Sequence, residues 1–195
     1  MVFLTLGRRQ GDAKVNEMGE ESVITSERRF RRATMGGFPT MLEIYEHARK
    51  LMASNGNPTQ WGDKFPREEV VRDDVESQRT VLLVDTVDGE ERVLAQFALC
   101  PGIDPTYVNI DGAWLDDDPY VTIHRIASSG LAKGAAKDCI NWCIEHYGNV
   151  RADTHPNNKA MQHVLESNGF ARCGLIQLLD RPSDTTRIAY QRHEW

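Results

Sequence analysis

The sequence has little that would mark a secreted, membrane-bound or metal-stapled protein. Its four cysteines form no CxxC pair and no dense framework, which favours reduced thiols in a cytosolic protein over a disulfide scaffold. No apolar run approaches the ~20 residues that a membrane span needs. The apolar N-terminus MVFLTL is soon interrupted by Arg8 and Arg9, unlike a secretory signal. These absences predict a cytoplasmic protein.

The chain also has too little positive charge for a nucleic-acid-binding surface. Lys and Arg number 23 against 29 Asp and Glu, so the net charge is −6, and a net negative surface repels a phosphate backbone. The same charge attracts a cation, such as a protonated amine. A hydrophobic share of 40% over 195 residues is enough for one domain with its own core.

The N-terminal segment lacks a sustained hydrophobic period and contains many charges. We expect residues 1–28 to form an extension that is flexible or loosely docked, and Met18 offers an alternative start. Regular periodicity begins near Arg29, so the folded domain is predicted to span residues 29–195.

Apolar residues at helical spacing and β-branched runs predict the elements of this domain. In chain order they are a strand over 29–33, helices over 38–53 and 66–75, strands over 80–85 and 92–99 around an Asp88-Gly89 turn, a strand over 120–128, a helix over 131–147, a strand over 150–154, a helix over 158–167, and strands over 170–179 and 186–190. A Gly-, Asp- and Pro-rich excursion covers 101–119. This order predicts a mixed α/β sheet covered by helices.

The segment from Ile123 to Ala136 predicts a strand, a loop of small residues and the start of a helix. Small residues let a phosphate approach the backbone, and the first turn of a helix offers unpaired N–H groups and a favourable dipole. Lys133 adds a positive charge. The alternative is a Gly- and Ala-rich loop that lets the helix pack closely on the sheet. The segment matches neither the P-loop pattern nor the GxGxxG pattern.

A second pattern follows the next strand: Asn158, a short helix, and then Gly169-Phe170. Together with the loop Leu131-Ala132-Lys133-Gly134-Ala135-Ala136, it resembles the GNAT-type N-acetyltransferases, whose loop is patterned Q/R-x-x-G-x-G/A. The resemblance covers roughly residue 29 to the C-terminus. It implies a central mixed, mostly antiparallel sheet of about six or seven strands flanked by about four helices. The chain departs from the family at Leu131, where Gln or Arg is usual, and at Leu165, where members often have a Tyr that acts as an acid.

The resemblance implies acetyl-CoA as the cosubstrate and assigns residues to it. Backbone groups of Ile126 and Ser128 are expected along the pantetheine arm, and the N–H of Ile126 or Ala127 is expected to stabilise the oxyanion. The pyrophosphate is expected on the loop residues Leu131, Ala132, Lys133, Gly134, Ala135 and Ala136. Asn158 is expected to reach the cofactor with its amide. Helix N-capping is the other role for Asn at such a position, and the two roles are compatible.

A primary ammonium of pKa ~10.4 must lose a proton before it attacks a thioester, so a general base is needed. His124 lies on the strand beside the expected thioester, two residues before Ile126 and so on the same face. His155 follows the next strand, and Asp153 can orient its ring. Each His also has a structural alternative: a bond within the sheet for His124, and loop capping or solvent exposure for His155.

Other candidate features favour structural roles. Cys139, Cys143 and His146 share a helix face, but no fourth ligand is evident, so no metal site is expected. Four aromatic residues come from segments that, by the resemblance, surround the acceptor cleft, and each is as readily a core residue. They are Trp61, Tyr107, Trp114 and Tyr120.

The predicted function is direct transfer of an acetyl group from acetyl-CoA to an amine, with no covalent enzyme intermediate. The acceptor is open between a small-molecule amine and a peptide amine. Nucleic acid and membrane partners are not expected, whereas related domains often pair as homodimers. The missing Tyr and the missing Gln or Arg leave an alternative, a non-catalytic acyl-CoA-binding or sensor module. A further alternative is a domain that binds another phosphorylated ligand at the same helix start.

Overall fold

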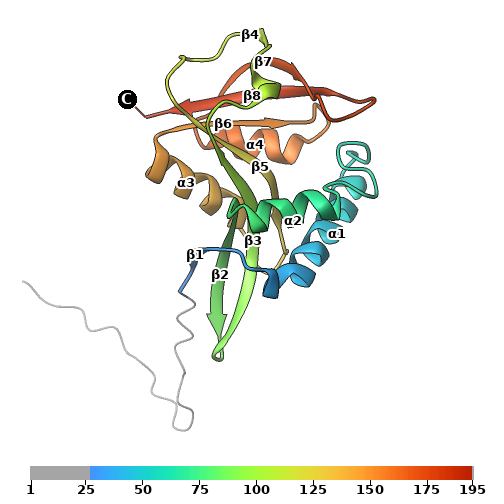
Figure 1. The fold of residues 1–195 in the computed structure, drawn as a ribbon, viewed down its shortest axis with the longest axis vertical. Coiled ribbons are helices and arrows are strands. Elements are labelled where there is room, and N and C mark those ends of the chain that lie inside the picture. Colours follow the sequence, from blue (N-terminus) through green and yellow to red (C-terminus); the bar gives the residue numbers. More distant parts are fainter. Residues whose placement is uncertain (1–26, 195) are drawn as a thin grey trace, which may run out of the picture.

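The computed structural model describes residues 27–194, which form one central sheet with helices on both faces (Figure 1). The strands are β1 (Arg29–Arg32), β2 (Thr80–Val87), β3 (Glu90–Pro101), β4 (Asp111–Gly112), β5 (Val121–Ser128), β6 (Asn149–Thr154), β7 (Ala171–Gln177) and β8 (Thr186–His193). The helices are α1 (Phe38–Ser54), α2 (Glu68–Glu76), α3 (Ala135–Tyr147) and α4 (Lys159–Ser167), with short 3-10 turns η1 (Met35–Gly37) and η2 (Pro105–Tyr107). The predicted N-terminal extension falls almost entirely outside the described range.

The eight strands lie in the order β1-β2-β3-β5-β6-β8-β7-β4. Every neighbouring pair is antiparallel except β5 and β6, which run parallel. The prediction of a mixed, mostly antiparallel sheet with about four helices is confirmed. The strand beyond those expected is the short β4, in the excursion. It approaches β7 so closely that a Cβ on Gly112 would lie 2.2 Å from the carbonyl oxygen of Cys173, which only glycine avoids.

Alternation along the strands divides the core between the two faces of the sheet. Leu83 packs in one cluster with Ile140 of α3 and Leu165 of α4. Its neighbour Leu82 packs in another cluster with residues of α1 and α2, among them Met41. All five side chains are at most 1% exposed, and full burial of such a side chain contributes ~1.5–3 kcal/mol. The two helix layers therefore hold the sheet from opposite sides.

Two helices begin later than the sequence predicts. α3 starts at Ala135, after a loop in which Gly130 and Gly134 adopt left-handed conformations (φ 85° and 78°). These conformations interrupt the helix that was predicted to begin at Leu131. α2 also starts late, because Pro66 lies before its N-cap residue rather than in its first turn.

The tight turn between β2 and β3 agrees with its prediction. Asp88 and Gly89 both have positive φ (53° and 81°), as a two-residue hairpin turn requires. Among the helices of the described region, none is long and apolar enough to cross a membrane.

Candidate functional site

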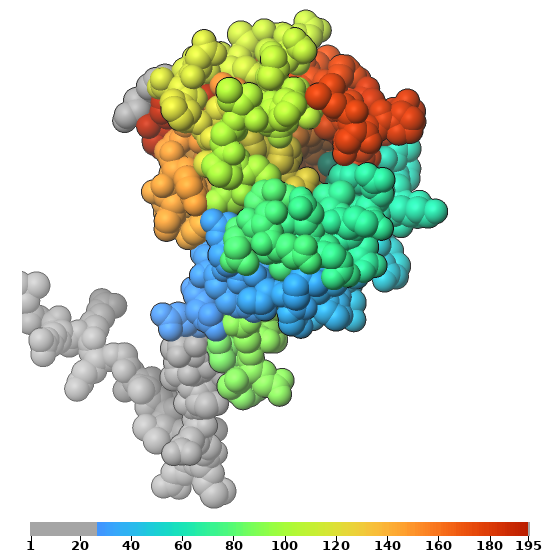
Figure 2. Space-filling view, in the orientation of Figure 1, coloured from blue at the N-terminus to red at the C-terminus, as the bar shows by residue number. Residues whose placement is uncertain are grey.

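A cavity of about 800 Å³ opens where two neighbouring strands of the sheet separate. β5 and β6 pair only over 121–123 and 150–152, and the rest of β5 pairs with β3 alone. The lining comes from both strand ends, the first two turns of α3, α4, the end of α1 with the loop after it, the segment around η2, and the β7–β8 loop with the start of β8. Figure 2 shows the red β7–β8 region lying directly above the cyan segment that follows α1. The cavity therefore connects the start of α3 with a second end at the β7–β8 loop.

A β-bulge shapes the wall that β5 contributes. The register with β3 slips between Gln96 and Ala98, and Arg125 takes a left-handed conformation (φ 54°) that is uncommon for a residue other than glycine. As a result, His124, Arg125 and Ile126 all line the cavity, although strict alternation would send adjacent residues to opposite faces. Because the pairing passes from Ala98–His124 to Gln96–Ala127, the same-face relation expected for His124 and Ile126 does not hold across the slip, although both residues line the cavity.

Asp74 of α2 fixes this bulge. Its carboxylate, 3% exposed, accepts hydrogen bonds from Nε and Nη2 of Arg125 at 2.8 and 3.0 Å. The same carboxylate accepts a hydrogen bond from Nε of Arg79 at 2.9 Å. A buried carboxylate with three charge-assisted bonds therefore holds the one β5 residue that departs from regular strand geometry.

Asp74→Asn is expected to lower the free energy of unfolding by about 2–3 kcal/mol, because two guanidinium groups lose their shared carboxylate. Asp73→Asn is the matched control. Its carboxylate also pairs with Arg79 but is 68% exposed, so the expected loss is at most about 0.5 kcal/mol. Urea denaturation at pH 7 measures both variants, and equal losses would contradict this role of Asp74.

The cavity gathers half of the residues that the resemblance assigns to the cofactor. Those in its lining are Ile126, Ala127, Ser128, Ala136 and Asn158. The others lie in the loop before α3 and at its first residue, outside the lining; they are Leu131, Ala132, Lys133, Gly134 and Ala135. The predicted pyrophosphate loop therefore borders the cavity at the start of α3 instead of forming its wall.

This loop ends at a helix N-terminus that no described side chain caps. Gly134 is the N-cap residue, and within the described region the place of its missing Cβ is open space. The first-turn N–H groups are therefore available, and the helix dipole favours an anion there. Asp138 in the same turn is negative, but it forms an ion pair with Arg28. The geometry suits a phosphate group.

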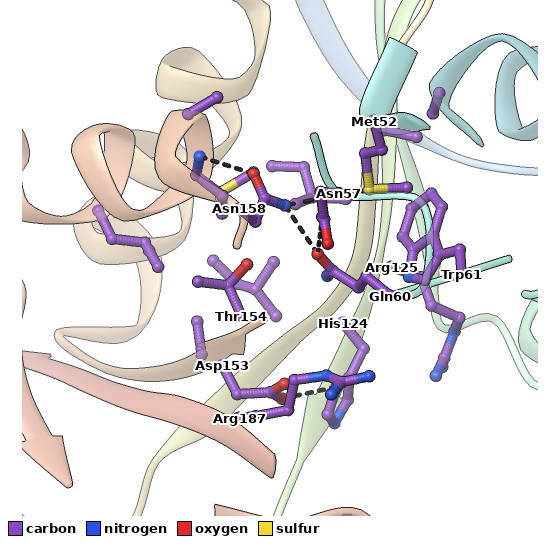
Figure 3. A pocket seen from close by; sticks show the side chains of 18 of the residues that line it. Met52, Asn57, Gln60, Trp61, His124, Arg125, Asp153, Thr154, Asn158 and Arg187 are labelled. Atoms are coloured by element: carbon purple, nitrogen blue, oxygen red, sulfur yellow. Dashed lines mark hydrogen bonds and ion pairs between the residues drawn. The ribbon is translucent and has the colours of Figure 1, made fainter. Parts of the chain in front are cut away.

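Asn158 caps α4 and also faces the cavity. Its Oδ1 accepts the backbone N–H of Met161 at 3.0 Å, so the capping role is confirmed. Its Nδ2 donates to Oε1 of Gln60 at 2.9 Å, and this oxygen also accepts a hydrogen bond from Nδ2 of Asn57 at 2.7 Å. This chain of amides, drawn in Figure 3, ties α4 to the loop after α1. A cofactor that used the Asn158 amide would compete with Gln60.

His124 lies in a network of acidic and phenolic groups at the other end of the cavity. Its Nε2 is 2.6 Å from Oδ2 of Asp104, and its Nδ1 is 4.0 Å from Oδ1 of Asp153. The hydroxyl of Tyr107 donates to the same Asp153 oxygen at 2.8 Å. Figure 3 shows His124 and Asp153 turned toward each other. The side chains of His124, Asp104 and Asp153 are all between 12% and 19% exposed, so solvent screens them only in part.

The protonation of this network follows from its surroundings. Burial disfavours the charged form of Asp104, but the hydrogen bond and charge of His124 and the N–H of Thr106 outweigh it, so the pKa of Asp104 is lowered. Burial and then the charge of Asp153 raise the pKa of Tyr107, which keeps the phenol a donor. When the ring of His124 is neutral, its Nε2–H can donate to the ionised Asp104, and Nδ1 is then the proton acceptor.

The structure does not bring His155 into the lining of the cavity. Its Nδ1 accepts the backbone N–H of Asn157 at 3.0 Å, and its Nε2 lies 2.8 Å from Oδ1 of Asp184. Asp153, which was expected to orient this ring, lies beside His124 instead. Because both nitrogens of His155 already hold the turn after β6, the geometry agrees with the loop-capping alternative.

Of the four aromatic residues expected around the acceptor cleft, one lines the cavity, Trp61. Tyr107, Trp114 and Tyr120 belong to a separate apolar cluster. There the guanidinium of Arg151 lies over the rings of Trp114 and Tyr120, at 4.1 and 3.9 Å from their centroids. Trp114 and Tyr120 therefore have the core role, whereas Tyr107 reaches the site through its hydroxyl.

Of the helical group Cys139, Cys143 and His146, the two cysteines belong to the core, whereas His146 is exposed. Both cysteines are fully buried, and burial raises the pKa of each thiol. Nδ1 of His146 bonds to the carbonyl oxygen of Trp142 at 2.8 Å. Within residues 27–194, the group with metal-ligand spacing lies elsewhere, at Asp116, Asp118 and His193.

Sequence reasoning missed several charged residues of the cavity. Asp104, Arg181 and Arg187 line it together with His124. Asp104 comes from the excursion and the two arginines from the β7–β8 hairpin, so the tertiary fold alone brings them to β5. Arg181 lies between the two closing strands that the sequence predicts, and nothing in that pattern indicates what the connection faces.

Comparison with known proteins gives matches in structure only. No family model matches the chain, and no curated protein matches its sequence. A GNAT-family acetyltransferase from Streptococcus agalactiae is similar with a TM-score of 0.74 and 29% identity, over 88% of this chain and 99% of that one. Two others share the fold at lower identity. They are the ribosomal-protein-alanine N-acetyltransferase from Brucella melitensis (TM-score 0.57, 16% identity, 85% and 99% covered) and the NatC complex bound to Gag peptide and CoA (TM-score 0.57, 14% identity, 87% and 99% covered).

Proposed function

The chain has the GNAT-type acetyltransferase fold, and from this premise we propose that it moves an acetyl group from acetyl-CoA directly to an amine. The observation that carries the proposal is the single cavity that joins the first turn of α3 to the Asp104–His124 pair. One end of this cavity suits the phosphates of a nucleotide cofactor, and the other end suits a cation that must lose a proton.

The residues along the cavity fit the cofactor. Past residue 123, β5 has no strand partner on its β6 side, so backbone groups of Ile126, Ala127 and Ser128 are open to an extended arm. In the opposite wall, the buried Oγ1 of Thr154 has no hydrogen-bond partner among the described residues. A buried polar atom of this kind calls for a ligand or water. Acetyl-CoA would supply a thioester whose acetyl carbon is open to attack.

The acid and base groups near His124 fit an amine acceptor. A protonated amine is attracted to Asp153, and Nδ1 of His124 takes the proton that the amine must lose. The resulting imidazolium lies between the carboxylates of Asp104 and Asp153, which stabilise its charge. The backbone N–H of Ile126 or Ala127 donates to the oxygen on which negative charge develops.

Direct transfer agrees with the other side chains of the cavity. None of the four cysteines, all of which lie in the described part of the chain, lines it. Leu165 lines the cavity, 1% exposed, where family members often have a Tyr. A thiol of pKa ~8.5 is a tolerable leaving group near neutral pH, so the reaction does not depend on that Tyr.

Leu165 also favours a second candidate function, a module that binds acyl-CoA and does not turn it over. In this case His124, Asp104 and Asp153 would form a structural ion network. The two functions differ in turnover and agree in cofactor binding.

Release of free thiol from acetyl-CoA, followed over a panel of amines, separates the two functions. We expect release that depends on the amine, with the acetylated amine identified by mass spectrometry. Binding of acetyl-CoA without amine-dependent release from any compound would support the non-catalytic module and contradict transfer.

A further inference from the structure

Two arginines face the end of the cavity where His124 lies. Arg187 is the second residue of β8, and Arg181 belongs to the β7–β8 loop. The side chain of Arg187 is only 2% exposed. Its Nη1 donates to the carbonyl oxygens of Asp184 and Thr186, both at 2.8 Å, whereas its buried Nη2 has no hydrogen-bond partner among the described residues. A buried guanidinium nitrogen in the wall of the cavity is therefore left without a partner among the described residues.

Arg181 is held in place beside it. Its Nη1 donates to the backbone carbonyl of Gln60, and its guanidinium lies 3.9 Å over the ring of Phe65. Its buried Nε also lacks a partner within the described region. Contacts from the loop after α1 thus fix the second guanidinium without using all of its donors.

The nearby carboxylates do not accept hydrogen bonds from Nη2 of Arg187 or Nε of Arg181. Oδ1 of Asp184 is 4.0 Å from Nη1 of Arg187 and is already 2.8 Å from His155. Asp153 accepts the hydroxyl of Tyr107 and faces His124. A buried guanidinium N–H without a partner costs free energy, so these donors are suited to an oxygen that arrives with a ligand.

We infer that the amine acceptor also carries a carboxylate, which Arg187 and Arg181 bind while its amino group lies between His124 and Asp153. The inference rests on the proposed function, since it assigns the second group of the same substrate. Arginine is the side chain best matched to a planar carboxylate. The three carboxylates of Asp153, Asp180 and Asp184 outnumber the two guanidinium charges near them, which disfavours a dianionic phosphate more strongly than a single carboxylate held by directed N–H donors.

The position of Arg187 limits the size of the acceptor. Because its side chain is buried, the carboxylate must enter the cavity completely. Figure 3 shows Arg187 together with Asp153 and His124 at one end of the pocket, so the amine and the carboxylate lie a few bonds apart. A free α-amino acid has this form, and so does the first residue of a peptide that begins with Asp or Glu.

Matched acceptor pairs test this inference. The probes are free amino acids against their carboxamides, and peptides that begin with Glu or Asp against peptides that begin with Gln or Asn. We expect kcat/KM for the carboxylate member of a pair to exceed that of its amide by ten- to a hundredfold, on the order of one charge-assisted hydrogen bond. Preference in the first set identifies a free amino acid, and preference in the second set identifies an acidic peptide terminus.

Variants tie the preference to these side chains. Arg187→Gln and, separately, Arg181→Gln are expected to reduce the preference toward unity, mainly through KM for the acceptor, with acetyl-CoA binding by calorimetry unchanged. Arg172→Gln, the same change at an exposed position of β7, is the control and should keep it. Far-UV circular dichroism checks that each variant folds. If Arg187→Gln does not fold, the test rests on Arg181→Gln and on the acid and amide acceptors measured with the wild-type protein.

The outcomes separate this inference from the proposed function. Equal rates with acid and amide, no turnover of any carboxylate probe, or a preference that neither arginine variant alters would overturn the carboxylate site. In each of these cases, acetyl-CoA binding and turnover of amines without a carboxylate would still support the proposed acetyl transfer. Absence of acetyl-CoA binding by the wild type would instead remove the proposed function itself.

Discussion

Replacement of His124 by alanine is expected to lower kcat by about 10²- to 10⁴-fold, the usual contribution of a general base, and to leave the affinity for acetyl-CoA unchanged. The ring is 2.6 Å from the carboxylate of Asp104, and its other nitrogen faces Asp153 across the cavity. The variant loses the proton acceptor but keeps the start of α3, where the cofactor is proposed to bind. The loss should therefore appear in turnover and not in cofactor binding.

The pH dependence distinguishes this role from a structural one. In the His124→Ala variant, water must take the proton, so the rate should follow the fraction of free amine and rise about tenfold per pH unit below the pKa of the acceptor used, which is ~10.4 for a primary alkylamine and ~7.7–8.0 for a peptide α-amino group. His163→Ala is the matched control, because His163 is exposed on α4 and lies outside the lining of the cavity. A loss of activity in His124→Ala that is small, or that high pH does not relieve, would contradict the assignment.

His155→Ala should behave differently from His124→Ala. His155 bonds to Asn157 and Asp184 and stabilises the turn after β6. Its loss should therefore lower the melting temperature and change kcat far less than His124→Ala does. A kcat loss as large as that of His124→Ala would reverse the two assignments.

Gly134→Asp is expected to weaken acetyl-CoA binding by at least about tenfold, because it places a carboxylate at the helix N-terminus that is proposed to receive the pyrophosphate. Two like charges about 4 Å apart near a protein surface repel by about 4 kcal/mol at an effective dielectric constant of 20. The helix dipole that should favour the phosphates would also be partly neutralised. Calorimetric titration of the variant measures the loss.

The control for this variant separates charge from backbone strain. Gly89→Asp makes the same change in the β2–β3 turn, where the glycine also has a positive φ (81° against 78°) and open space at its Cβ position. It should bind acetyl-CoA as the wild type does. Equal losses in both variants would assign the effect to strain or folding and would count against a phosphate site at α3.

Most of the fold could be predicted from the sequence, because the elements that form it carry their own local pattern. Helical spacing along α1, the β-branched run of β2 and the Asp88-Gly89 turn each specify a structure within a few residues. The start of α3 could not be placed in this way, since no local pattern in the sequence indicates the left-handed conformation of Gly134.

The candidate site was predicted only in part, for a physical reason. Ile126 and Asn158 lie close to motifs that local sequence reveals, and both line the cavity. Asp104, Arg181 and Arg187 come from an irregular excursion and a hairpin loop, where no periodicity indicates what a side chain faces. The sequence likewise paired Asp153 with His155 on spacing alone, whereas the bulge at Arg125 in β5 and the turn after β6 determine its actual neighbour, His124.

Calorimetric titration of the wild-type protein with acetyl-CoA is the measurement that bears most directly on the proposed function. The expected result is saturable binding with one site per chain, because one cavity joins the start of α3 to His124. Absence of binding at concentrations up to about 1 mM, the upper end of usual KM values, would contradict the proposed transferase and leave the chain with the GNAT-type fold alone.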